Sequence, residues 1–205
     1  HYGKTADQPY VLMGHSMGSF LVRQYLGFYG AGLTGAIIMG TGNQPTMILQ
    51  AGKLVCKLTA LFKGWKCRSG LVDGMAVGSY NKEFEKETDG SNWLSRNPEN
   101  VSQYRNDLLC GYMFTVNAYY HMFDGMVKMN AQEKAGRIPR GVSIAFVAGK
   151  DDPVGDFGKG VQAVYQQIVK NEYLNIQNQE LIQNVENQVI RSKSKVNQVN
   201  IVRHD

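Results

Sequence analysis

Gly14 and Gly18 flank Ser16 in the stretch GHSMG. The residues before this stretch are apolar and predict a short buried strand, and those after it repeat apolar side chains at helical spacing. Glycines two positions either side of a serine are typical of a sharp strand-to-helix turn, in which larger side chains would collide. Such a turn raises the serine hydroxyl above the sheet and directs helical N–H groups toward it. The pattern therefore predicts a nucleophilic serine.

A serine hydroxyl needs a nearby base to accept its proton, and a carboxylate must hold that base in the right orientation. Asp151 and Asp152 follow an apolar run at 142–148, and His204 follows a shorter predicted strand at 196–202. If these runs are parallel strands, their carboxyl ends lie at the same edge of the sheet as Ser16. The order serine, aspartate, histidine therefore predicts a catalytic triad.

The elements that must position these residues follow a regular order. Apolar runs at 10–13 and 36–39 enclose a helical pattern, and strand, helix and strand in this order favour a parallel α/β unit. The run at 142–148 and a helical pattern at 161–169 continue it. The Asn- and Gln-rich stretch 171–198 is interpreted as an extra helix or an insertion. We expect an α/β fold with a mostly parallel sheet flanked by helices.

Between 45 and 137 the pattern changes to helices alone. One predicted helix, at 53–66, has an apolar face with lysines at its other positions, and an aromatic-rich helix is predicted at 110–129. Their apolar residues exceed what an insertion of this size needs to hold itself together. We expect the surplus to line a pocket, formed among others by Leu54, Leu58, Phe62, Phe114, Tyr119 and Phe123.

Four stretches together resemble one family: GHSMGS, GKDDPVGDFGKGV, the ending RHD and the helical insertion NWLSRNPENVSQYRNDLLCGYMFTVNAYY. They are similar to the serine-aminopeptidase and lysophospholipase-like branch of the α/β hydrolases, to which monoacylglycerol lipases belong. The resemblance implies that Ser16 is the nucleophile, Asp152 the acid and His204 the base. It also implies that the N–H of Met17 stabilises the oxyanion and that 45–137 is a cap over the acyl pocket.

The resemblance further implies that 1–44 and 138–205 form the α/β-hydrolase core. Members of the family have further strands before the serine turn and a closing helix after the histidine, so we expect a chain truncated at both ends. The implied reaction is hydrolysis of a carboxylic ester, such as a monoacylglycerol or lysophospholipid, with no cofactor and no metal. An inactive remnant that acts as a binding or structural module, and a peptidase or acyltransferase with the same triad, are the alternatives.

Other residues compete for the same roles. Asp151 is the alternative acid, because the two aspartates are adjacent in one turn. His15 lies within the serine turn and His121 in the aromatic-rich helix, where packing is the simpler interpretation of both. His121 and Asp124 have the i, i+3 spacing of a metal-binding pair, but no third ligand lies near them in the sequence.

The composition is that of one globular domain, with 205 residues of which 43% are hydrophobic and 19% charged. The net charge of +5 comes without the basic runs typical of nucleic-acid binding. No apolar run reaches the roughly 18 residues of a membrane span. Three cysteines without a CxxC pair favour free thiols and a cytoplasmic protein. The apolar face at 53–66 is compatible with a peripheral membrane contact. An exposed edge of the predicted sheet is compatible with a homo-oligomer.

Overall fold

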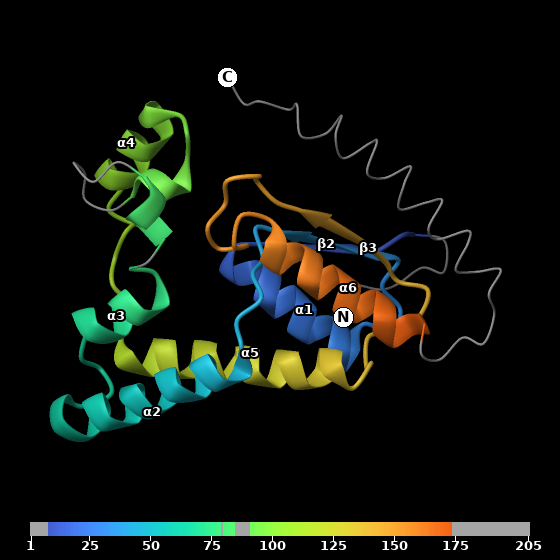
Figure 1. Ribbon diagram of the computed structural model, residues 1–205, viewed down its shortest axis with the longest axis horizontal. Helices are drawn as coiled ribbons and strands as arrows, with labels where there is room; N and C mark the ends of the chain where they lie inside the picture. Colours follow the sequence, from blue (N-terminus) through green and yellow to red (C-terminus); the bar gives the residue numbers. More distant parts are fainter. Residues whose placement is uncertain (1–7, 79, 85–90, 174–205) are drawn as a thin grey trace.

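The computed structural model describes residues 8–78, 80–84 and 91–173 (Figure 1). Its sheet has three parallel strands in the order β1-β2-β3: β1 (Val11–His15), β2 (Gly35–Met39) and β3 (Ser143–Val147). The central strand pairs residue by residue with both neighbours, so Ala36 lies between Leu12 and Ile144. Because the strands run in the same direction, the residues that follow them gather at one edge of the sheet.

One face of this sheet carries an apolar core. The helices that pack on it are α1 (Met17–Tyr29) and α6 (Lys159–Tyr173). The buried residues of the cluster include Val22 and Leu26 from α1, Ala36 and Ile38 from β2, and Val164 and Ile168 from α6. Removing such side chains from water contributes about 25 cal/mol per Å² of apolar surface. This burial holds α1, and with it the turn at Ser16, against the sheet.

The opposite face is more open in the described part of the chain. Val11 and Met13 of β1 point to that face and are 51% and 55% exposed. β1 is also an edge strand of the described sheet. The expected parallel sheet is confirmed, and both helices of the buried cluster lie on one side of it.

A helical segment connects β2 to β3 and extends to the left in Figure 1. Its elements are α2 (Thr46–Lys63), α3 (Gly70–Ala76), the 3-10 helices η1 (Tyr80–Glu83) and η2 (Asn92–Leu94), α4 (Pro98–Asn106) and α5 (Val116–Lys134). α2 and α5 share a second apolar cluster, which includes Leu49, Cys56, Tyr119 and Phe123. α5 also packs against α1, so it contacts both the helical segment and the sheet layer.

The predicted helices are present, but their ends differ. The aromatic-rich helix predicted from 110 begins only at Val116, where the side chain of Thr115 accepts a hydrogen bond from the N–H of Ala118 at 3.2 Å. This cap satisfies one of the unpaired donors of the first turn. The helix predicted at 53–66 begins earlier, at Thr46, and ends at Lys63, so Trp65 lies beyond it.

The apolar face predicted for α2 is not the buried one. Leu54, Leu58 and Phe62 are 57%, 50% and 81% exposed. The buried positions are instead Leu49, Gly52, Cys56 and Ala60, most of which are small. A Cβ atom on Gly52 would lie 2.9 Å from the ring of Phe123, so the small residues let α5 approach closely. Packing against α5 therefore decides which apolar face is covered.

The last strand, predicted at 196–202, and the stretch from 174 onward lie outside the described residues. Within the described ranges, no helix combines the length and the apolar character that crossing a membrane requires.

Candidate active site

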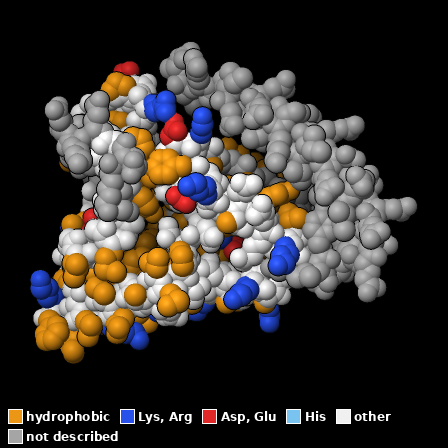
Figure 2. Space-filling view, in the orientation of Figure 1, with side chains coloured by type: hydrophobic (Ala, Val, Ile, Leu, Met, Phe, Trp, Pro, Cys, Tyr) orange, Lys and Arg blue, Asp and Glu red, His pale blue; other side chains and the backbone are white. Residues whose placement is uncertain are grey.

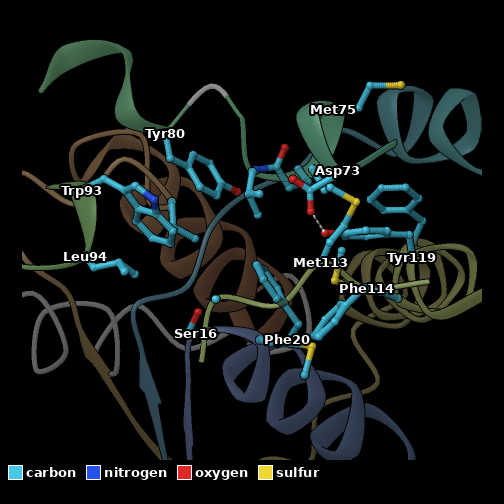
Figure 3. Close-up of a pocket in the computed structure, with 18 of the residues that line it drawn as sticks. Ser16, Phe20, Asp73, Met75, Tyr80, Trp93, Leu94, Met113, Phe114 and Tyr119 are labelled. Carbon is cyan, nitrogen blue, oxygen red and sulfur yellow. Dashed lines mark hydrogen bonds between the residues drawn. The ribbon is translucent and has the colours of Figure 1, made fainter. Parts of the chain in front are cut away.

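Ser16 lies in the turn between β1 and α1, with a backbone φ of 53° and ψ of −119°. This φ is rare for a residue with a Cβ atom, and strain of this kind is concentrated at functional sites. The N–H of Ser16 donates to the carbonyl of Met39 at 2.9 Å, and its carbonyl accepts from the N–H of Ser19 at 2.9 Å. Since Met39 ends β2, the turn is fixed to the neighbouring strand. Figure 3 shows the Ser16 side chain directed away from the strand, toward a cavity.

The two glycines of the turn differ in their surroundings. A Cβ atom on Gly14 would lie 2.2 Å from the carbonyl oxygen of Gly18 and 2.6 Å from Val22, so no side chain fits there. A Cβ atom on Gly18 would meet no described atom within 4 Å. The expected collision is therefore confirmed at Gly14 and wrong for Gly18 within the described part of the chain.

Met17 is the first residue of α1. The first N–H groups of a helix have no acceptor within it, and the N-terminal end carries a partial positive charge. The N–H of Met17 therefore lies beside Ser16 at an end of the helix that favours negative charge.

Asp152 lies in the turn that follows β3. Its backbone N–H donates to the carbonyl of Gly149 at 3.3 Å, and its Oδ1 accepts from the N–H of Val154 at 2.9 Å. A Cβ atom on Gly40 would lie 3.5 Å from Oδ2 of Asp152 and 3.6 Å from the ring of His15. Gly40 follows β2 and has a φ of 59°. The residues at the ends of the three strands thus approach one another at one edge of the sheet.

The neighbouring Asp151 has a different environment. It forms an ion pair with Arg96, and the two side chains are 42% and 84% exposed. Asp152 instead lies near the half-buried phenol of Tyr80: desolvation raises the pKa of Tyr80, and the negative charge of Asp152 raises it further. Arg96 and Tyr80 both belong to the helical segment, which therefore reaches over the turn that holds the two aspartates.

The histidines are placed as follows. His204 lies outside the described residues. His121 is exposed on α5, where its ring meets that of Tyr120 edge-on with centroids 5.3 Å apart. Among the described residues no group of three or more His, Cys, Asp or Glu side chains could hold a metal ion.

A cavity of about 660 Å³ lies beside Ser16, between the end of the sheet and the helical segment. In Figure 3, Tyr80 and Trp93 lie on one side of it, and Phe114 and Tyr119 lie on the other. The rings of Tyr80 and Trp93 are in contact, with centroids 5.0 Å apart. Most of the lining is apolar and includes Phe20, Leu49, Met75, Trp93, Met113, Phe114, Phe123 and Met126.

The sequence predicted only part of this lining. Phe114, Tyr119 and Phe123 line the cavity as expected. Leu54, Leu58 and Phe62 do not, because they lie on the outer face of α2. Sequence reasoning missed Asp73, Tyr80 and Trp93, which lie on short helices where hydrophobic periodicity carries little signal.

Residues 2–178 match the sequence model of the family described as serine aminopeptidase, S33. Comparison with curated protein sequences gives no match. Among solved structures, a highly thermostable carboxyl esterase from Bacillus coagulans, in complex with glycerol, is similar with a TM-score of 0.72 and 25% identity. That similarity covers 96% of this chain and 66% of the esterase.

Two further structures show the same fold. A lipase in its open form is similar with a TM-score of 0.71 and 21% identity, over 83% of this chain and 56% of the lipase. A monoacylglycerol lipase from Paleococcus ferrophilus gives a TM-score of 0.52 and 18% identity, over 80% of this chain and 55% of that one. The chain therefore spans between 55% and 66% of the lengths of these three structures.

Proposed function

Since the chain belongs to the serine aminopeptidase S33 family of α/β hydrolases, we propose that it is a serine hydrolase that cleaves a carboxylic ester. The observation that carries this proposal is the strained backbone of Ser16, with φ of 53°, beside a cavity of about 660 Å³. A serine raised in this way at the carboxyl edge of the sheet meets the substrate with its hydroxyl. Because many chemistries share this fold, the site and not the fold supports the reaction.

In the proposed reaction, His204 takes the proton of the Ser16 hydroxyl while Oγ attacks the acyl carbonyl. The N–H of Met17 stabilises the negative charge that develops on the carbonyl oxygen. The histidine then gives its proton to the leaving alcohol, the bond from the carbonyl carbon to the alcohol oxygen breaks, and the acyl group stays on Ser16. Water, deprotonated by the same histidine, then attacks the acyl carbon. The bond from that carbon to Oγ of Ser16 breaks, the histidine returns the proton to Oγ, and the acid leaves. Asp152 orients the imidazole throughout.

Asp152 is the better supported acid. Its Oδ2 lies 3.5 Å from the place of a Cβ atom on Gly40, at the edge that also holds Ser16. Asp151 instead pairs with Arg96 at the surface. A triad acid must face the edge where the serine lies, which favours Asp152.

The proposed substrate is lipid-like, such as a monoacylglycerol or lysophospholipid. The support is the apolar lining of the cavity, which an acyl chain would fill with favourable burial of its methylene groups. The segment 45–137 contributes most of that lining, and we propose that it acts as the cap over an acyl pocket, with 1–44 and 138–205 as the core.

Peptide cleavage and acyl transfer remain alternatives that use the same triad. An inactive remnant, in which the cavity binds a ligand without converting it, is a further alternative.

A fluorophosphonate probe separates an enzyme with an activated serine from an inactive remnant, because it labels activated serines and leaves ordinary ones unmodified. Mass spectrometry should locate the label on Ser16 in the original chain and in Ser102→Ala, an exposed serine of α4 that serves as the control. Ser16→Ala should not be labelled. Labelling of another serine while Ser16 stays unmodified would refute the assignment, and no labelling at all would support the inactive remnant.

Contact with a membrane surface is also proposed, for one face of α2. Leu61 and Phe62 are 76% and 81% exposed there, and Lys57 and Lys63 are exposed beside them. Figure 2 shows hydrophobic side chains gathered at the lower left, with lysine or arginine side chains at their margin. Such a surface suits anionic lipid, and sedimentation with anionic rather than neutral vesicles tests this contact.

A homo-oligomer through the edge of β1 is the alternative use of exposed apolar surface, and sedimentation velocity tests whether it forms.

A further inference from the structure

Asp73 is the one formally charged side chain among the described residues that line the cavity. It belongs to α3, and its carboxylate accepts a hydrogen bond from the hydroxyl of Tyr119 on α5. Figure 3 shows this pair on the side of the cavity opposite Tyr80 and Trp93. None of the ion pairs between described residues includes Asp73. Among the described residues, no cation pairs with this carboxylate and no other carboxylate, lysine or arginine lines the cavity.

Tyr119 holds this carboxylate in place. Its side chain is only 4% exposed, and its ring contacts those of Phe114 and Phe123 at centroid distances of 5.6 and 6.2 Å. Burial raises the pKa of Tyr119, and its hydrogen bond to Asp73 raises it further. The phenol therefore keeps its proton and directs it at Asp73, so Tyr119 does not donate to anything else in the cavity.

The carboxylate retains unused capacity. Two carboxylate oxygens offer about four acceptor positions, of which Tyr119 occupies one. A charged group in a largely apolar environment is costly unless donors satisfy it. A ligand that fills the cavity with hydrocarbon alone would leave Asp73 without water and with Tyr119 as its one donor among the described residues. A ligand that carries a donor at this position would satisfy it.

We propose that Asp73, positioned by Tyr119, binds a hydrogen-bond-donating group of the substrate, a hydroxyl or an ammonium. The inference rests on the proposed function, because it names the substrate class of the same cavity: amphiphilic esters that carry such a donor and have no negatively charged group beside it. The donor belongs either to the alcohol portion of the ester or to the far end of the acyl chain. A phosphate or carboxylate at this position would be repelled by Asp73.

The test uses ethers that cannot be hydrolysed, so it does not depend on turnover. Isothermal titration measures the binding of octyl methyl ether, 1-O-octylglycerol, 8-methoxyoctan-1-ol and 8-methoxyoctan-1-amine to the full chain. At least one of the last three should bind about tenfold or more tightly than octyl methyl ether, as expected for a hydrogen bond to a charged acceptor. Tight binding of 1-O-octylglycerol would place the donor on the alcohol side of the ester. Tight binding of 8-methoxyoctan-1-ol or 8-methoxyoctan-1-amine would place it at the end of the acyl chain.

Asp73→Asn should remove most of that preference, because the neutral amide accepts hydrogen bonds less strongly. Tyr119→Phe should reduce it several-fold by releasing the carboxylate. Asp124→Asn is the matched control, since Asp124 is another carboxylate of the helical segment but pairs with Lys53 and Lys128 and does not line the cavity. It should leave the preference unchanged.

Equal binding of all four ethers by the unmodified chain would overturn the inference without any variant. A preference that survives in Asp73→Asn would overturn it as well. Fluorophosphonate labelling of Ser16 reports separately on the proposed function. Selective ether binding without labelling would contradict the hydrolase alone, and labelling without selective binding would contradict only the role of Asp73.

Discussion

The guanidinium of Arg23 on α1 and the carboxylate of Glu133 on α5 form a bidentate ion pair, with hydrogen bonds of 2.7 and 2.8 Å. The two side chains are 1% and 2% exposed. The remaining nitrogen of Arg23 donates to the carbonyl of Gly42 at 2.7 Å and to the hydroxyl of Thr41 at 3.0 Å. One buried side chain therefore connects the helix after Ser16, the last helix of the helical segment and the loop that follows β2.

Removal of one partner of this pair should destabilise the fold strongly. Glu133→Ala leaves the Arg23 charge buried without its carboxylate, which costs about 3–5 kcal/mol in comparable cases. Arg96→Ala is the control, because that arginine is 84% exposed in its pair with Asp151 and should change the free energy of unfolding by less than about 1 kcal/mol. Urea unfolding of both variants measures the difference. Similar small losses in both would mean that the buried pair contributes little.

The nucleophile turn should depend on one of its glycines more than on the other. Gly14→Ala places a methyl group 2.2 Å from a backbone oxygen of Gly18, so the turn must shift, at a cost of about 1–3 kcal/mol or more. Gly18→Ala meets open space near the start of α1, where alanine is the better helix former by up to about 1 kcal/mol. The unfolding temperature of Gly14→Ala should be well below that of Gly18→Ala. The opposite order would show that the turn has another geometry.

The sequence patterns predicted those features that depend on residues close together in the chain. The apolar run before GHSMG and the helical spacing after it were enough for the turn at Ser16, since the turn depends on neighbours in sequence. The buried face of α2 could not be predicted, because apolar residues occupy two faces and the small residues Gly52 and Cys56 matter only once α5 is in place.

Contacts between residues far apart in the chain could not be predicted from the sequence. Asp73 and Tyr119 are 46 positions apart, and Arg23 and Glu133 are 110 apart. No periodicity links such pairs, so only the folded arrangement of the helices reveals them. The turn after β3 is an intermediate case: the sequence predicted two candidate acids there, and the pairing of Asp151 with Arg96 distinguishes their surroundings.

The ion pairs of Asp124 with Lys53 and Lys128 should stop contributing to the free energy of unfolding when the pH falls through a defined range. Hydrogen bonds from Lys128 and Lys53 lower the pKa of Asp124 from 3.8 to about 2. Because the folded pKa is the lower one, the stabilisation is present above the unfolded value and is lost as the pH falls toward about 2. Since Lys128 is 60% exposed, we expect a contribution below about 1 kcal/mol.

Asp124→Asn should therefore lower the free energy of unfolding near neutral pH and have little effect once the pH is below about 2. Urea unfolding of the two proteins across the acid range measures this convergence. A difference that stays constant down to the lowest pH would show that it arises from packing and not from the charge of Asp124.

The two adjacent aspartates should differ sharply in their effect on ester hydrolysis. If Asp152 orients the base, Asp152→Asn lowers kcat by a factor on the order of a thousand or more, because the imidazole loses its proper tautomer. Asp151→Asn removes only an exposed pair with Arg96 and should change kcat several-fold at most. Steady-state kinetics with one soluble ester compares them, with circular dichroism as the check on folding. The reverse ranking would transfer the role of acid to Asp151.

Acyl-chain preference should follow the lining of the cavity. Each methylene group buried there contributes about 0.8 kcal/mol, so lengthening an ester from four to eight carbons should raise kcat/KM by roughly ten- to several hundred-fold. Phe114→Ala removes a ring from the lining and should reduce this gain, with little effect on acetate. Phe62→Ala is the matched control, because that ring is 81% exposed on α2 and does not line the cavity. A series of p-nitrophenyl esters from acetate to laurate measures all three proteins. A rate that falls steadily from acetate upward in the unmodified chain would contradict the lipid-like substrate and favour a small ester or a peptide.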